Sequence, residues 1–175
     1  MFSSVLLGKV LKVYQIKRLI VFLDPNTDPL GSGWNIIQSK IAIGAGGIFG
    51  QGYLNGTQSH YRFLPQQSTD FIFSILSEEL GFVGGIIVFG LYLFIFLRIL
   101  SIIKKCPNRY GTYICAGIFG MFIFHFFINI GMVMGIMPIT GIPLLFLSYG
   151  GSSLLTAMTC IGLLQSVNNR RGDYK

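Results

Sequence analysis

Asp70 is the residue of this sequence best placed for acid–base chemistry. It is the only acidic residue between Asp28 and Glu78, and it stands in the sequence STDFIFSILSEELG, where a long apolar segment begins. A carboxylate at the edge of a membrane can take a proton from a hydroxyl group. At the start of a helix it can instead cap free backbone N–H groups. The residues alone leave both roles open.

The other reactive side chains form no recognisable constellation. Cys106, Cys115 and Cys160 are scattered, and His60 is far from His125, so no metal-ligand spacing is present and no protein-bound metal is predicted. No nucleophile-elbow motif occurs either. His125 falls in an uncharged stretch, where a buried, hydrogen-bonded histidine is favoured over a proton relay.

The glycine-rich sequence GAGGIFGQG, from Gly44 to Gly52, matches neither the dinucleotide fingerprint nor the Walker pattern. Its glycines allow tight turns and close approach of backbones. Exposed N–H groups in such a loop can also bind a phosphate of a lipid-linked ligand. The sequence does not rank these two interpretations.

The composition excludes an ordinary soluble domain. Of the 175 residues, 52% are apolar and only 11% are charged, whereas about a quarter of the residues of a soluble domain are charged. The mean hydropathy is +0.66. The net charge of +7 comes from 13 Lys and Arg spread thinly along the chain. This pattern predicts membrane anchoring and no nucleic-acid partner.

Hydropathy and charge spacing predict an all-α integral membrane protein with helices over 80–103, 112–134 and 150–168. No charge occurs from Leu80 to Leu97, and the uncharged stretch from Tyr110 to Asn169 holds two further crossings of roughly 20 residues each. The run PITGIPLLFLSYGGSS predicts a broken or re-entrant element before the last helix, which protein or a wet cavity must cover.

The basic residues that flank the spans predict the orientation. They lie in the first short loop and at the C-terminus, so both places, and the C-terminus itself, are expected in the cytoplasm. Residues 9–79 then form an extracytoplasmic loop. These flanking cations are Arg98, Lys104, Lys105, Arg109, Arg170, Arg171 and Lys175.

Residues 1–8 are expected to be the end of a preceding helix, and segments 9–23 and 35–43 to be short interfacial helices. A straight helix from Asp70 to Ile103 would measure about 50 Å, more than the hydrocarbon core of a bilayer. We therefore expect its first turns to stand above the bilayer, with Asp70 at the outer mouth.

Three stretches give the chain a specific resemblance. FLDPNTDPLGSGWNIIQSKIAIGAGGIFGQG (22–52), GTQSHYRFLPQQSTDFIFSILSEELGFVGG (56–85) and NIGMVMGIMPITGIPLLFLSYGGSS (129–153) resemble the SEDS family of polytopic membrane proteins. The QSK and GTQ elements favour its RodA branch over its FtsW branch. The resemblance implies that residues 1–175 form one C-terminal SEDS membrane domain, a fragment of a ten-helix fold.

The resemblance implies a peptidoglycan glycosyltransferase that polymerises lipid II in the bacterial cytoplasmic membrane during cell elongation. Its implied partners are membrane lipid, a class B penicillin-binding protein and other membrane proteins of the elongation complex. Asp70 matches the family's essential acid and would act as general base on a sugar 4-hydroxyl. Departure of pyrophosphate needs positive charge, from a divalent cation or from side chains. The candidate substrate-binding residues are Lys40, Gln58, Arg62, Thr69 and Ser152.

Two other functions stay open at this point. Polar groups within the spans suit a transporter, or flippase, of lipid-linked precursor. Ser68 stands where the family usually has His, and Gln66 where an acid is common. Together with the implied missing half, these departures suit a truncated, non-catalytic remnant or an assembly module of the elongation machinery.

Overall fold

The computed structural model describes residues 13–24, 27–28, 31–56, 69–106 and 108–170. The expectation for residues 1–8 lies outside these ranges. Within them the regular elements are all helices, as the predicted fold class requires. They are α2 (Val13–Leu23), α3 (Ser32–Gly46), α5 (Ile72–Lys105), α6 (Arg109–Val133) and α7 (Gly151–Asn169).

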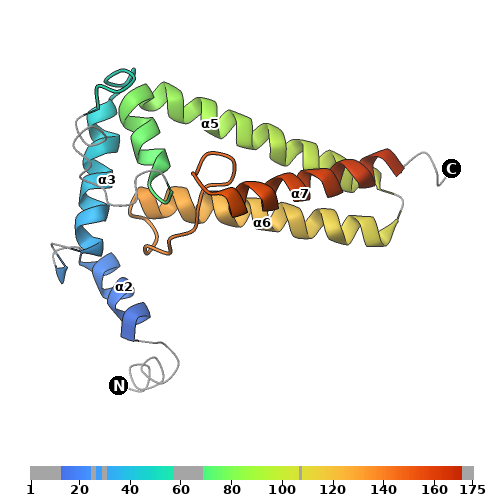
Figure 1. Cartoon of the computed structure of the whole chain (residues 1–175), viewed down its shortest axis with the longest axis horizontal. Helices are drawn as coiled ribbons and strands as arrows, with labels where there is room; N and C mark the ends of the chain where they lie inside the picture. The colour runs from blue at the N-terminus through green and yellow to red at the C-terminus, as the bar shows by residue number, and fades with distance from the viewer. Residues whose placement is uncertain (1–12, 25–26, 29–30, 57–68, 107, 171–175) are drawn as a thin grey trace.

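The helices form a bundle with a crosspiece at one end. Figure 1 shows α5, α6 and α7 side by side along the long axis, with α3 upright across one end and α2 continuing beyond it. The turn between α5 and α6 and the end of α7 lie together at the opposite end. Phe126 of α6 packs its ring against Phe89, Tyr92 and Phe96 of α5, with centroid distances of 5.2, 4.6 and 5.7 Å. Apolar packing of this kind holds the two longest helices together.

The α5 helix is bent, which corrects the expectation of a straight rod from Asp70 to Ile103. Gly81 has φ 66° and ψ −158°, so the helix is interrupted there. The turns before Gly81 fold back beside α3 and do not continue outward (Figure 1). The start of α5, and Asp70 just before it, therefore return toward the C-terminal end of α6.

The glycine-rich loop repairs the hydrogen bonding that this bend interrupts. A break in a helix leaves carbonyl and N–H groups without their usual partners. Here the carbonyls of Glu78 and Glu79 and the N–H groups of Phe82 and Val83 all pair with residues 47–52. The four donor-to-acceptor pairs are Gln51 to Glu78 (2.9 Å), Gly52 to Glu79 (3.1 Å), Phe82 to Gly47 (2.9 Å) and Val83 to Ile48 (3.2 Å). This packing supports the structural interpretation of the glycines.

Two helices of the described chain, α5 and α6, are long and apolar enough to cross a membrane by length and composition. They contain or nearly contain the predicted spans 80–103 and 112–134, and the predicted span 150–168 lies on α7. The count of three spans stays a prediction. The segments expected to be interfacial, 9–23 and 35–43, overlap α2 and α3.

Replacement of Gly81 by alanine is expected to destabilise the protein. A Cβ at Gly81 would lie 2.3 Å from Gly50 N and 2.7 Å from Ile48 O, and the positive φ adds strain. Backbone strain alone costs roughly 1–3 kcal/mol. Thermal unfolding in detergent should show a lower transition temperature for Gly81→Ala.

The matched control is Gly90→Ala on the same helix, where a Cβ would have no heavy atom within 4 Å. Alanine favours a helix over glycine, so this variant should be neutral or slightly stabilised. Equal transition temperatures for the two variants would contradict the role given to Gly81.

Candidate active site

Asp70 lies in the turn that precedes α5, and it is partly buried. The helix begins at Ile72 with Phe71 in the N-cap position and no side-chain cap. The Phe71 carbonyl accepts hydrogen bonds from the N–H groups of Ser74 (3.0 Å) and Ile75 (3.5 Å). The interpretation of Asp70 as the N-cap was therefore wrong, because the helix starts one residue too late for its carboxylate to serve that end.

The Asp70 carboxylate faces the segment that joins α6 to α7. A Cβ at Gly141 would lie 3.2 Å from Asp70 Oδ2, so the carboxylate lies against the backbone of this glycine. Gly141 has φ +72°, in the left-handed region that glycine adopts without strain. We refer to residues 134–150, which contain no helix, as the connecting loop.

The connecting loop folds back against α5 and α6, with Leu144 and Leu145 buried. From α5 and α6, three polar side chains donate to its carbonyls: Tyr92 Oη to Leu145, His125 Nδ1 to Pro143 (3.0 Å) and Asn129 Nδ2 to Ile142 (2.8 Å). Because a carbonyl can only accept, His125 must carry its proton on Nδ1 in this contact. The expectation of a buried, hydrogen-bonded His125 is confirmed for the hydrogen bond, while the side chain is only partly buried.

Two cations contact the same loop. The Arg18 guanidinium, from α2, donates to the Ile139 carbonyl at 2.6 Å. The exposed Lys40, on α3, lies over Gly135, where a Cβ would be 2.2 Å from Lys40 Cε and 2.6 Å from Nζ. Lys40, Arg18 and Asp70 thus contact Gly135, Ile139 and Gly141 in that order along one short stretch of backbone.

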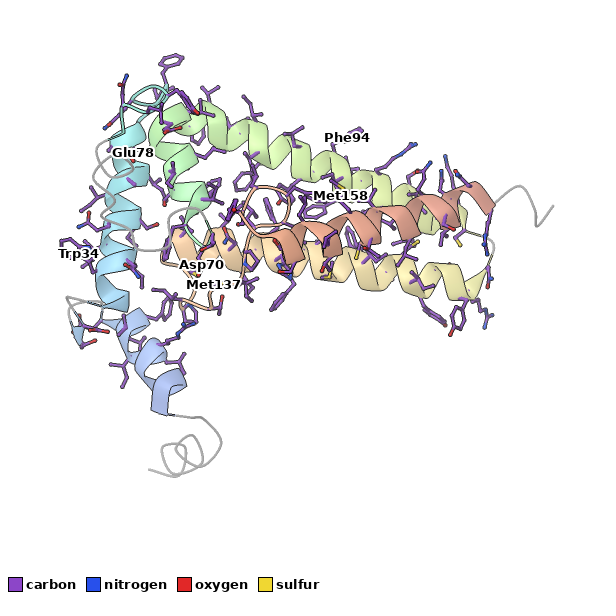
Figure 2. All side chains as sticks on the ribbon, in the orientation of Figure 1. Trp34, Asp70, Glu78, Phe94, Met137 and Met158 are labelled. Atoms are coloured by element: carbon purple, nitrogen blue, oxygen red, sulfur yellow. The ribbon has the colours of Figure 1, made fainter. Side chains whose placement is uncertain are left out.

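Of the sequence-predicted site residues, the structure brings Lys40 and Asp70 to one loop, with Thr69 beside Asp70 in the same turn. Ser152 is exposed in the first turn of α7, and its backbone carbonyl accepts a hydrogen bond from Thr156 Oγ1, one turn along (2.9 Å). Gln58 and Arg62 lie outside the described residues. Figure 2 shows Asp70 and Met137 at the end of the bundle near α3, with Glu78 further along the first turns of α5.

Arg18 and Asn129 were not among the site residues predicted from sequence. Arg18 occurs in a basic, amphipathic segment that was assigned to the lipid headgroup region. Asn129 resembles the many small polar residues that pack helices in membranes. No sequence pattern marks either residue as part of the site, because each one binds backbone groups that are distant in sequence.

The described residues do not form a ready metal site. No group of three or more His, Cys, Asp or Glu among them could hold an ion. Asp70 would be a single ligand, and hard cations such as Mg²⁺ need several oxygen ligands. The donor set therefore does not fit a protein-held divalent cation, and we assign no chemical step to one.

An apolar groove of about 720 Å³ runs between α3, the bend of α5, and α6. Among the described residues that line it, Ser77 alone has a polar side chain, so the groove suits hydrocarbon better than sugar. The lining residues are Ile43, Gly47, Phe73, Ser77, Gly81, Phe82, Gly85, Ile86, Phe89, Gly90, Leu93, Phe96, Phe126, Phe127 and Met134.

The helical bundle with an acid beside a connecting loop belongs to a known class of membrane protein. Residues 1–172 match the FtsW/RodA/SpoVE family, described as cell cycle proteins. The match covers almost the whole chain, so the chain is a member of this family.

Similar proteins carry related names. The chain is 68% identical over 171 residues to the peptidoglycan glycosyltransferase RodA of Treponema pallidum, covering 97% of this chain and 40% of the relative. It is 47% identical over 158 residues to the peptidoglycan glycosyltransferase MrdB of Escherichia coli K12, covering 90% of this chain and 43% of the relative. The chain thus spans less than half the length of these relatives.

A solved structure shares the fold. It comes from a study of how a peptidoglycan synthase complex coordinates polymerization and crosslinking. The match has a TM-score of 0.77 and 32% sequence identity, and covers 98% of this chain and 46% of the other. The helices of this chain are therefore arranged like the matching part of that longer chain.

Removing the Tyr92 hydroxyl is expected to destabilise the fold. Tyr92→Phe leaves the buried Leu145 carbonyl without its donor, and an unsatisfied buried group costs about 1–3 kcal/mol. The control is Tyr113→Phe on α6, because Tyr113 is 70% exposed. Thermal unfolding in detergent should shift for Tyr92→Phe alone, and an unchanged transition would show that the loop does not depend on this bond.

Proposed function

We propose that this chain is the catalytic C-terminal part of a peptidoglycan glycosyltransferase that polymerises lipid II, with Asp70 as general base. The observation that carries the proposal is the placement of a carboxylate and two cations along one loop, from Gly135 to Gly141. The names of the T. pallidum and E. coli relatives support the reaction type. Support for the class of donor comes from the apolar groove near the site, which suits a lipid-linked substrate.

The proposed chemistry is a displacement at an anomeric carbon. Asp70 takes the proton from the 4-hydroxyl of the acceptor sugar as that oxygen forms the new glycosidic bond. The bond from the anomeric carbon to the lipid pyrophosphate breaks, and the pyrophosphate leaves with the electron pair. Arg18 and Lys40 supply positive charge for this leaving group. Arg62, which the sequence pairs with Lys40 as a candidate for this role, lies outside the described residues and stays a candidate.

The charge distribution supports an orientation with Asp70 outside the cytoplasmic membrane. Lys104, Lys105, Arg109 and Arg170 are exposed at the end of the bundle that holds the turn between α5 and α6. The positive-inside rule assigns that end, and the C-terminus, to the cytoplasm. The site then faces the side where the glycan is assembled. We propose a class B penicillin-binding protein as partner, from the family resemblance.

Asp70→Asn is expected to abolish polymerisation. Because the chain matches 40% of the T. pallidum relative, the assay uses a hybrid in which this chain replaces the matching segment of that relative. Loss of a general base lowers the rate about 10²- to 10⁴-fold, while the amide keeps the shape of the side chain. Gel analysis of glycan strands made from labelled lipid II measures the rate.

The control for Asp70→Asn is Asp24→Asn, an exposed acid at the end of α2, which should leave the rate unchanged. Full polymerisation by Asp70→Asn would overturn the assigned chemistry. Movement of lipid II across a vesicle membrane that persists in Asp70→Asn, with no polymer made by the unaltered hybrid, would favour the transporter instead.

Arg18→Met and Lys40→Met are each expected to raise the KM for lipid II. A hydrogen bond to a charged group contributes about 1.5–3 kcal/mol, which corresponds to at least a tenfold change. Lys104→Met removes a cation at the opposite end of the bundle and should leave the KM unaltered. An equal rise in KM for all three variants would indicate a general charge effect and would exclude a local site for pyrophosphate.

A further inference from the structure

Asn129 ties the candidate base to the connecting loop with a single amide group. It is fully buried on α6, with 0% of its surface exposed. Its Nδ2 donates to the Asp70 carbonyl at 2.9 Å and to the Ile142 carbonyl at 2.8 Å. Both hydrogens of one NH₂ group are therefore used, on two segments that lie 59 and 13 residues away in sequence.

The orientation of this amide follows from its surroundings. Turning the group over would place Oδ1 against two carbonyl oxygens, which repel it, so the nitrogen must face them. In this orientation Oδ1 is buried and has no hydrogen-bond partner among the described residues. An unsatisfied buried acceptor is unfavourable, which indicates that the two donated bonds outweigh it.

The two bonded carbonyls lie on either side of the contact between Asp70 and Gly141. One carbonyl belongs to Asp70 itself, and the other belongs to Ile142, the residue after Gly141. The Asp70 carboxylate lies against Gly141, 3.2 Å from the position of a Cβ there. The amide thus fixes the distance between the backbone that carries the carboxylate and the backbone that the carboxylate faces.

We propose that Asn129 is a positioning residue for the glycosyl transfer, which acts by holding Asp70 in register with the connecting loop. The proposal rests on the function proposed for Asp70. Asparagine suits the task because one neutral nitrogen donates twice without placing a charge beside the carboxylate. Asn129 makes no contact with substrate in this role, and its effect reaches the reaction through Asp70.

His125 provides a matched comparison on the same helix. It lies one turn before Asn129 and bonds the Pro143 carbonyl, next to Ile142, at 3.0 Å. Its hydrogen bond therefore anchors the same loop and, unlike those of Asn129, does not go to Asp70. A variant of His125 reports the effect of loosening the loop, and a variant of Asn129 reports that effect together with loss of the bond to Asp70.

The test measures kcat and KM for labelled lipid II in the hybrid enzyme carrying Asn129→Leu, Asn129→Gln or His125→Leu. Misplacing a reacting group by about 1 Å can cost on the order of 100-fold in rate. For Asn129→Leu we expect a loss of kcat of about that size with KM within about twofold. The Asn129→Gln variant, which keeps the NH₂ donor, should recover a measurable part of kcat. His125→Leu should lower the unfolding temperature and keep most of kcat.

Each outcome bears on the proposal. Gel filtration and thermal unfolding first identify the variants that fold. If Asn129→Leu does not fold, Asn129→Gln serves as the test. Unchanged kcat in a folded Asn129→Leu, a rise in KM that accounts for the loss, or an equal loss of kcat in His125→Leu would overturn the positioning role. The proposed function fails separately, when Asp70→Asn keeps full activity. If Asp70→Asn is inactive and Asn129→Leu is fully active, only the positioning role fails.

Discussion

The connecting loop depends on one constraint: backbone polar groups that leave a helix inside an apolar bundle must find new partners. Water satisfies such groups at a protein surface, but not within hydrocarbon. In this chain side chains from α5 and α6 satisfy the carbonyls of Ile142, Pro143 and Leu145. The Ser148 hydroxyl accepts from the Leu144 N–H at 2.8 Å, within the loop itself. The loop is an ordered surface against which a carboxylate can be placed.

The same constraint explains why the bend in α5 and the glycine-rich loop occur together. A helix that breaks at Gly81 exposes carbonyls and N–H groups on both sides of the break. Residues 47–52 supply the missing partners, and the two backbones come this close because Gly50 and Gly81 lack a Cβ. A Cβ at Gly50 would lie 2.1 Å from the Glu79 carbonyl oxygen, and one at Gly81 would lie 2.3 Å from Gly50 N. Two features that look unrelated in the sequence are one structural device.

The sequence predicted the positions of the long apolar helices well, but it did not predict which side chains contact the connecting loop. Long uncharged stretches predicted helices close to those of α5, α6 and α7, because burial in lipid demands apolar runs. The motif around Asp70 led to the candidate site, and the structure brings Lys40 and Asp70 to one loop there. The bend at Gly81 was missed, since a glycine within an apolar run is tolerated in a straight helix as well as in a broken one. The contacts of Arg18 and Asn129 were missed because backbone carbonyls of remote segments leave no mark in a sequence.

The interlock at Gly81 has a mechanical consequence for the site. Hydrogen bonds from residues 47–52 join the end of α3 to the bend of α5, so α3 and the first turns of α5, which run parallel, form a frame closed at that end. Lys40 is carried on α3, and Asp70 lies just before the first turns of α5. The frame therefore sets the separation of Lys40 and Asp70. The connecting loop between these two residues is held to α5 and α6 by side-chain hydrogen bonds. Movement of the connecting loop would therefore leave the spacing of Asp70 and Lys40 unchanged, because neither residue belongs to that loop.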